Sequence, residues 1–241
     1  MNHPILILHG WGGSSNSWKT VKEILEKEGF KVYNPDFPGF GQEADPPKPW
    51  SVADYTEWIK KYSEREGISQ FFLLGHSFGG RVATKFAAQN PEKIMGLILV
   101  GSAGFGREKT LEFRQKIAIR LRKIGYFFVM LPFLKNFYPF FRKIAYIFAG
   151  TRDYYLIKNP VMKETFKKVI AEDITPYLSQ IKSKVLIIWG KKDNTVPVNI
   201  AYLIKEKVPQ SQLELLEGVK HNPNSEAPEK LTEILINFLK S

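Results

Sequence analysis

Six short apolar runs, separated by amphipathic stretches, restrict the fold of this chain more than any other feature of its sequence. Most of the runs are almost continuously apolar, as in strands that are buried on both faces of a parallel sheet. The stretches between them place apolar residues at helical spacing. This alternation predicts an α/β fold, with a doubly wound, mainly parallel six-stranded sheet of order 2-1-3-4-5-6. The expected strands are 5–8, 31–36, 71–75, 94–101, 184–190 and 212–217, and the expected helices are 17–28, 52–66, 79–90, 198–207 and 226–239.

One long segment interrupts the alternation. Residues 107–175 contain no clear strand, and the apolar residues of 110–131 repeat at helical spacing. Prolines and a glycine divide the remainder into short helices. We therefore expect a core domain of residues 1–104 and 178–241, and a helical cap, or lid, of residues 105–177 inserted over the carboxyl edge of the sheet.

The third apolar run leads directly into a serine between glycines, FFLLGHSFGG (71–80). A strand that ends in G-x-S-x-G and continues as a helix predicts a nucleophile elbow. The turn is so sharp that the residues two before and two after the serine crowd together, which requires Gly75 and Gly79. The serine hydroxyl is exposed at the apex, above the positive end of the following helix. Ser77 is therefore the candidate nucleophile.

A serine hydroxyl is a weak nucleophile at neutral pH, so it requires a general base that is oriented by an acid. The chain contains four histidines. His9 ends the first strand and His76 neighbours the serine, and we assign both mainly to structural hydrogen bonds; His3 precedes the sheet. His221 follows the last strand, at the edge where ligand-facing residues gather in this architecture, and is the candidate base.

The acid is expected in a loop after an intervening strand. In KVLIIWGKKDNTVP (184–197), Asp193 follows a strand and precedes a helix. The preceding strand ends in GSAGFG (101–106), which contains no carboxylate, so the main alternative position for the acid is empty. The chain order Ser77, Asp193, His221 is one of the known orders of a nucleophile, acid and base triad.

The remaining requirement is an oxyanion hole, which is built from N–H groups directed at the developing negative charge. One donor is expected to be the main-chain amide of Phe78, the residue after the nucleophile. The other is expected from the glycine-rich loop HGWGG (9–13), through the main chain of Trp11. In the expected strand order the first and third strands are neighbours, so Trp11 and Ser77 should meet at the carboxyl edge.

The motifs together resemble those of the α/β-hydrolase superfamily, and more closely its small, helically capped bacterial branch of carboxylesterases. They are HGWGG (9–13), DFPGFG (36–41), GHSFGG (75–80), WGKKDNTVP (189–197) and the late His221. The resemblance covers residues 5–101 and 184–239, whereas the lid matches only in type. Relative to that family, the chain lacks the usual first two strands, and Gln42 departs from the usual pattern after GFG.

The resemblance implies a mechanism with an acyl-enzyme intermediate. In this mechanism Ser77 is the nucleophile, His221 the base and Asp193 the acid. The main chains of Trp11 and Phe78 supply the oxyanion donors. It also implies a serine hydrolase, here expected to cleave carboxylic esters of small to medium acyl chains.

Other functions use the same three residues. A C–C bond hydrolase, lactonase, perhydrolase or lyase is an alternative, because the triad does not choose among these substrates. A non-catalytic small-molecule-binding protein is a further alternative. The presence of all three triad residues argues against it. The side chains expected to line the substrate pocket are those of Trp11, Phe78, Phe105 and Phe128.

The formal net charge of +11 is concentrated in the expected cap. Residues 105–182 contain 16 Lys and Arg but only 6 Asp and Glu. One interpretation is a basic amphipathic lid that makes peripheral contact with an anionic membrane. The other is that the cap's aromatic residues pack on the sheet and line an apolar pocket. No nucleic-acid partner is expected, because no helix-turn-helix, zinc-finger or RRM-like pattern accompanies the charge.

Composition excludes several kinds of chemistry. The chain contains no cysteine, which excludes disulfides, thiolate metal sites and a cysteine nucleophile, and favours a reducing compartment. No H-x-x-x-H or close His and carboxylate cluster occurs, so we expect neither a metal nor another cofactor. The start MNHPILILHG lacks the features of a signal peptide, and the chain is expected to be cytoplasmic.

Overall fold

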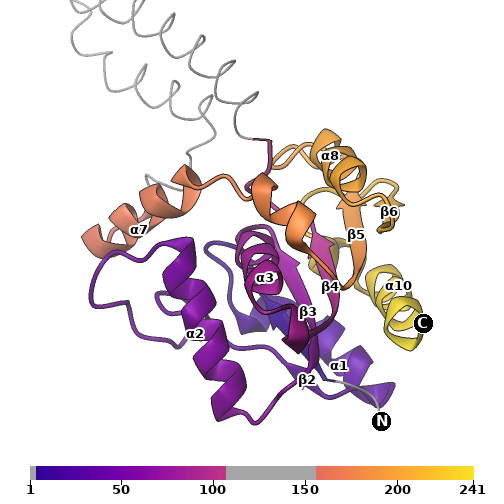
Figure 1. Cartoon of the computed structure of the whole chain (residues 1–241), viewed down its shortest axis with the longest axis horizontal. Helices are drawn as coiled ribbons and strands as arrows, with labels where there is room; N and C mark the ends of the chain where they lie inside the picture. Colours follow the sequence, from indigo (N-terminus) through magenta and orange to yellow (C-terminus); the bar gives the residue numbers. More distant parts are fainter. Residues whose placement is uncertain (1–3, 107–155) are drawn as a thin grey trace, which may run out of the picture.

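The six expected strands form one all-parallel sheet of order β2-β1-β3-β4-β5-β6, as predicted (Figure 1). The computed structural model describes residues 4–106 and 156–241. The strands are β1 (Ile5–Leu8), β2 (Val32–Tyr33), β3 (Phe71–His76), β4 (Ile94–Val100), β5 (Lys184–Gly190) and β6 (Gln212–Leu216). Because all run the same way, the loops that follow them meet at one edge of the sheet, which is where the candidate site residues lie.

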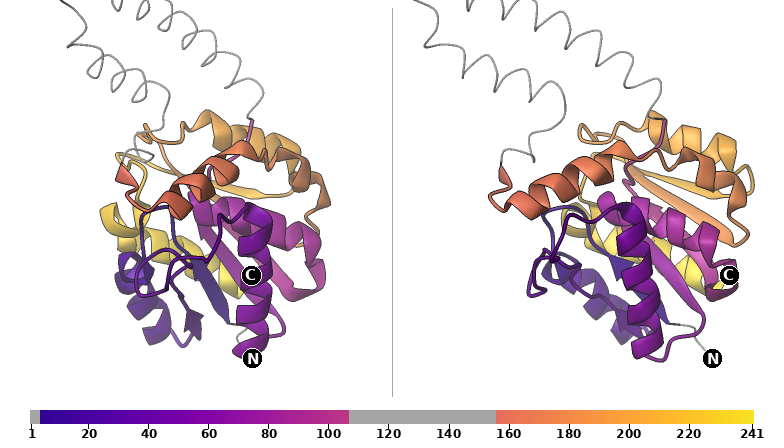
Figure 2. Two further views of the ribbon diagram at one scale, coloured as in Figure 1. Left: turned by 90° about the vertical axis from the view of Figure 1, so that its left-hand side faces the viewer. Right: turned by 60° about the vertical axis from the view of Figure 1, so that its left-hand side comes forward.

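Helices cover both faces of the sheet (Figure 2). The helices α2, α3 and α8 contribute to one hydrophobic layer, and α1 and α10 contribute to the other. The longer helices are α1 (Lys19–Lys27), α2 (Val52–Arg65), α3 (Phe78–Gln89), α7 (Pro160–Ala171), α8 (Asn199–Lys207) and α10 (Pro228–Lys240). Shorter ones are η1 (Ser15–Trp18), η2 (Pro91–Lys93), η4 (Thr175–Gln180) and α9 (Pro223–Glu226).

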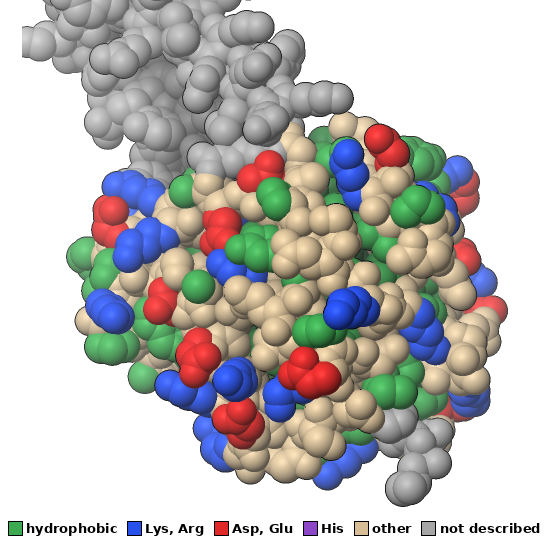
Figure 3. Space-filling view, viewed as in Figure 1, with side chains coloured by type: hydrophobic (Ala, Val, Ile, Leu, Met, Phe, Trp, Pro, Cys, Tyr) green, Lys and Arg blue, Asp and Glu red, His purple; other side chains and the backbone are tan. Residues whose placement is uncertain are grey.

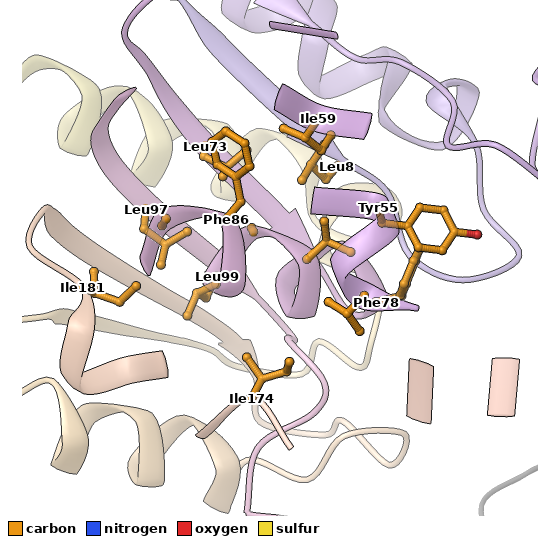
Figure 4. Packing of buried hydrophobic residues seen from close by; sticks show 14 of the residues in the cluster. Leu8, Tyr55, Ile59, Leu73, Phe78, Phe86, Leu97, Leu99, Ile174 and Ile181 are labelled. Carbon is orange, nitrogen blue, oxygen red and sulfur yellow. The ribbon is translucent and has the colours of Figure 1, made fainter. Parts of the chain in front are cut away.

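Alternation along the strands separates the two layers. Leu73 of β3 packs in the layer of α2 and α3, whereas its neighbours Phe72 and Leu74 pack in the layer of α1 and α10. Figure 4 shows Leu73 and Leu97 of the sheet beside Phe86 of α3, all fully buried. Each such side chain contributes about 1.5–3 kcal/mol of hydrophobic stabilisation. This packing holds α3, and with it the serine that precedes it, firmly on the sheet.

The second strand is shorter than the predicted 31–36 and contains only Val32–Tyr33. Asn34 and Asp36, which follow the strand, bond to the loop after β1 and not to a neighbouring strand. The side-chain amide of Asn34 donates to the carbonyl of Ser15, and Asp36 accepts from the Ser15 amide. Pro35 between them has no N–H to donate to a ladder. Val32 and Tyr33 of this run form the strand, whereas its polar residues Asn34 and Asp36 connect the edge of the sheet to the loop after β1.

The helix α7 lies over the carboxyl edge of the sheet beside the start of α2, and η4 packs against α3 and α8 (Figures 1 and 2). Asn159 caps α7 by accepting from the amides of Val161 and Met162. The Trp50 amide, just before α2, donates to Thr165 Oγ1 at 2.9 Å. The predicted short helices of 107–155 lie outside the described residues, so the limits of the cap stay a prediction.

Acidic and basic side chains are interspersed on the face shown in Figure 3. Most of the excess positive charge belongs to residues 107–155, which contain eleven Lys and Arg against three Asp and Glu and lie outside the described part of the chain. The predicted membrane contact of the basic lid depends mainly on these residues and stays a prediction. Among the described residues, no helix combines the length and the apolar character needed to cross a membrane.

Candidate active site

Ser77 occupies a strained turn between β3 and α3. Its φ of 51° is the only positive value of a non-glycine residue among the described residues. Such strain persists only where the surroundings enforce it. Here they do, because a Cβ at Gly79 would overlap the carbonyl oxygen of Leu8 in β1, and a Cβ at Gly75 would overlap the carbonyl of Gly79. The two glycines let α3 pack directly against the sheet and so fix the turn, as the motif predicted.

The structure brings Ser77, His221 and Asp193 into one hydrogen-bonded chain. Nδ1 of His221 lies 2.7 Å from Oδ2 of Asp193, and Nε2 lies 3.1 Å from Oγ of Ser77. A carboxylate only accepts, so Nδ1 carries the imidazole proton and donates it to Asp193. The lone pair of Nε2 therefore faces the serine hydroxyl, which donates to it.

Asp193 is held rigidly in the loop after β5. The residue is 6% exposed, and its second oxygen, Oδ1, accepts from the amides of Thr195 and Val196 at 2.8 and 2.9 Å. The indole of Trp189 donates to the carbonyl of Val196 and anchors the far side of this turn. Both carboxylate oxygens thus have partners, which is the usual condition for burying a charge.

The loop that carries His221 is tied down by a carboxylate that sequence reasoning missed. Glu226 accepts from the amide of Lys220 at 2.7 Å and from the amide of Asn222 at 3.0 Å, one on each side of the histidine. Glu226 binds main-chain groups, which every residue has, so the spacing of residue types in the sequence does not predict this contact. The only signal is a carboxylate shortly after the histidine in HNPNSE (221–226).

The two histidines assigned to structural roles do form buried hydrogen bonds. Nδ1 of His9 donates to the carbonyl of Gly10 at 2.8 Å, and Nε2 accepts from the amide of Phe37 at 3.0 Å. Nε2 of His76 donates to the main-chain carbonyl of His221 at 2.9 Å. Burial lowers the pKa of His9, and it lowers the pKa of His76 to about 4. Both rings are therefore uncharged near neutral pH and link loops from different strands.

The loop that carries Trp11 lies beside the serine, and Phe78 follows the serine directly in the chain. A Cβ on Gly10 would stand 3.3 Å from Cβ of Ser77, so the loop after β1 contacts the elbow, as the strand order predicted. Trp11 follows in that loop, and its ring packs edge-to-face on Phe78 with centroids 5.3 Å apart. Among the described residues, the amides of Trp11 and Phe78 donate to no protein acceptor. Both remain available for a ligand oxygen.

The DFPGFG loop (36–41) is bonded to the segment that follows β1. The carboxylate of Asp36 accepts from the amides of Ser15 and Gln42. Burial opposes the charge, but these hydrogen bonds outweigh it and lower the pKa of Asp36. A Cβ on Gly41 would overlap this carboxylate, so glycine is needed there. Gln42, which departed from the family pattern, contributes its main-chain N–H to this turn.

A cavity of about 310 Å³ opens beside Trp11. Of the four aromatic residues expected to line the pocket, Trp11 lines this cavity. Phe78 and Phe105 are 3% and 4% exposed and belong to the hydrophobic core, and neither lines the cavity. Phe128 lies outside the described residues. The lining residues are Trp11, Gly12, Gly39, Phe40, Asp45, Leu156, Ile157, Lys158, Asn159 and Met162.

No group of three metal-ligating side chains occurs among residues 4–106 and 156–241. The ring nitrogens of His9 and His221 are all engaged by protein partners, and Nε2 of His76 is engaged as well. The chemistry that this arrangement can perform is proton transfer between a serine hydroxyl and an imidazole.

The sequence profile of the family described as "alpha/beta hydrolase fold" matches residues 3–228 of the chain. The chain belongs to this family. Lipase 1 of Psychrobacter immobilis is 30% identical over 243 residues, a match that covers 93% of this chain and 73% of that protein. The human monoacylglycerol lipase ABHD6 is 27% identical over 258 residues, which cover 98% of this chain and 75% of that protein.

A solved structure, the thermophilic esterase from Thermogutta terrifontis, superimposes with a TM-score of 0.73 and 24% identity. The match covers 99% of this chain and 89% of that one. At this identity the likeness concerns the fold. The α/β-hydrolase fold expected from the motifs is thus confirmed by family profile and by architecture.

Replacing Gly79→Ala in this α/β hydrolase is expected to destabilise the fold by about 3 kcal/mol or more, because the new Cβ would overlap the backbone of Leu8. Gly67→Ala is the control: it places alanine at a φ of 66° with open space around it, which costs only about 1–2 kcal/mol. Urea unfolding of both variants measures the difference. Equal destabilisation would contradict close packing of α3 on the sheet at Gly79.

Proposed function

We propose that this α/β hydrolase is a serine esterase that cleaves carboxylic esters of small to medium acyl chains through an acyl-enzyme intermediate. The observation that carries the proposal is the chain of hydrogen bonds from Ser77 Oγ through His221 to Asp193. The lipase and esterase relatives support ester hydrolysis over other reactions of the fold. The filled triad also argues against a purely ligand-binding protein.

In the proposed reaction Ser77 Oγ attacks the ester carbonyl while Nε2 of His221 takes its proton. The tetrahedral intermediate collapses, the protonated His221 returns the proton to the leaving alcohol, and an ester of Ser77 remains. Water then attacks that ester with His221 again as base, and the free acid and Ser77 are released. Asp193 holds the imidazole in the required tautomer and stabilises the imidazolium.

The amides of Trp11 and Phe78 form the proposed oxyanion hole. Phe78 directly follows Ser77, Trp11 follows Gly10, which contacts Ser77, and both amides lack a protein acceptor within the described part of the chain. Phe78 is the first residue of α3, so the positive end of that helix adds to the field at the oxyanion. Fixed donors of this kind contribute about 3–4 kcal/mol each to lowering the barrier.

The proposed substrate site includes the cavity beside Trp11, which would hold a modest, mostly apolar group; Ser77, Asp193 and His221 are not among its lining residues. Its volume of about 310 Å³ is at the small end of the ~300–1,000 Å³ typical of ligand pockets. Apolar side chains of Phe40, Leu156, Ile157 and Met162 form much of its wall. We retain the division into a core of residues 1–104 and 178–241 and a cap of residues 105–177 as part of this proposal. Residues 156–159 and Met162 of that cap line the cavity.

Replacing Ser77→Ala is expected to reduce kcat for nitrophenyl ester hydrolysis by about 10³-fold or more, because the attacking oxygen is lost. The control is Ser179→Ala, which removes an exposed hydroxyl from η4 and should leave the rate unchanged. Far-UV circular dichroism verifies that both variants fold. A folded Ser77→Ala variant with most of the parental rate would refute the nucleophile.

A series of nitrophenyl esters from acetate to palmitate tests the substrate class. We expect kcat/KM to reach its maximum among the short and medium acyl chains, because the cavity is small. The rates are measured below and above the critical micelle concentration of each ester, with Ser77→Ala as the blank, and kcat/KM is compared below it. A maximum at palmitate that rises above the micellar threshold would contradict the proposed chain length and favour a lipase acting at interfaces.

A further inference from the structure

We propose that His76 is a positioning residue for the general base: its Nε2–H holds the main-chain carbonyl of His221 and so sets the direction of the catalytic imidazole. This inference rests on the proposed function, since it concerns the same base. It assigns a role in catalysis to a buried histidine that the reaction itself does not use.

His76 bonds directly to the main chain of His221, and the donor and acceptor of this hydrogen bond can be assigned. Nε2 of His76 lies 2.9 Å from the carbonyl oxygen of His221, and His76 is 5% exposed. A carbonyl oxygen can only accept, so the proton must reside on Nε2. The other edge of the ring faces the oxyanion loop, because a Cβ on Gly10 would stand 3.0 Å from Nδ1. The ring of His76 therefore lies between the oxyanion loop and the loop of the base.

Three of the peptide groups around His221 are bonded to side chains. Glu226 accepts the amides before and after the histidine, and His76 donates to the carbonyl of the histidine itself. Asp193 then fixes the ring through Nδ1. Of these contacts only the one from His76 originates in the nucleophile elbow. It is the contact that ties the position of the base to the position of the serine.

Adjacent residues in a strand and its extension point in opposite directions, which explains how one turn serves both groups. Ser77 points to the site, whereas His76, the last residue of β3, points toward the layer of α1 and packs edge-to-face on Trp18 at 5.9 Å. The peptide bond between the two residues is planar, and the close packing of α3 at Gly79 fixes the turn that follows it. A shift of His76 would therefore move His221 and Ser77 together and preserve the Ser77 to His221 distance.

His76 must be neutral to perform this role without opposing the reaction. Its ring lies 5.1 Å from the ring of His221, which takes up a proton during each acylation step. Burial, reinforced by the proximity of His221, lowers the pKa of His76 to about 4. Asp193 and His9 are the other titratable groups that act on it, the first raising and the second lowering its pKa. A neutral ring at this position places no positive charge beside the imidazolium that forms on His221 in the proposed reaction.

The decisive comparison is between His76→Gln and His76→Met. The two side chains have the same length and similar volume, but only glutamine can donate to the carbonyl of His221. We expect His76→Met to lower kcat for nitrophenyl butyrate by about 10–100-fold with little change in KM, because a misplaced base slows chemistry more than binding. His76→Gln should recover most of the loss. Leu97→Ala, a core variant in β4 remote from the site, controls for lost stability and should retain the parental kcat.

Equal kcat in the methionine and glutamine variants, with both melting like the parent, would overturn the proposal. A loss confined to KM would also overturn it, since that would mark a substrate contact. Proton NMR supplies a readout that needs no substrate: the far-downfield resonance of the His221 Nδ1 proton should persist in His76→Gln and be lost or shifted in His76→Met. Its persistence in both variants would contradict the proposal even if the parent hydrolysed no ester, whereas absence of turnover in the parent alone would refute the proposed function.

Discussion

The close packing of α3 on the sheet at Gly79 is the constraint on which the remaining geometry depends. With no side chain at that position, the helix lies against the carbonyl of Leu8, and the chain between β3 and α3 must turn within one residue. That turn forces Ser77 into the left-handed region, with a φ of 51°. The strain costs about 1–3 kcal/mol and is offset by the burial of ten of the twelve residues of α3. The packing of α3 thus stabilises a strained turn that exposes the hydroxyl of Ser77.

The parallel strands bring the other residues of the candidate site to the same edge of the sheet as Ser77. Trp11, Asp193 and His221 each follow a different strand, and their loops meet Ser77 at the carboxyl edge of the sheet. Loops alone would not hold distances of 2.7 and 3.1 Å across such a junction. Buried polar side chains supply the missing rigidity: His9 joins the loops after β1 and β2, and His76, at the end of β3, holds the loop after β6.

Much of this arrangement could be predicted from the sequence, because the relevant signals are local. The apolar runs placed the strands to within a residue or two, with the exception of 31–36, where Asn34 and Asp36 bond to a neighbouring loop that no pattern announces. The elbow follows from sterics at two glycines. The acid and base followed from chain order and from the sheet edge on which they had to lie.

Other features depend on contacts that sequence does not encode locally. Glu226 binds main-chain amides, and a main-chain partner leaves no mark on residue spacing. Phe78 and Phe105 were expected in the pocket but lie in the core, since an aromatic residue beside a site can face either way and only tertiary packing decides. The excess of basic residues in 107–155 belongs to a part of the chain outside the described residues.

The central claim is that Ser77 is an activated nucleophile, and covalent trapping tests it most directly. The purified protein is treated with a fluorophosphonate ester, and intact mass and peptide mapping locate the adduct. The geometry predicts a single stoichiometric adduct on Ser77 that forms far more slowly in His221→Ala, because the imidazole no longer accepts the serine proton. A folded protein that stays unmodified, or one that is labelled equally fast without His221, would contradict the account.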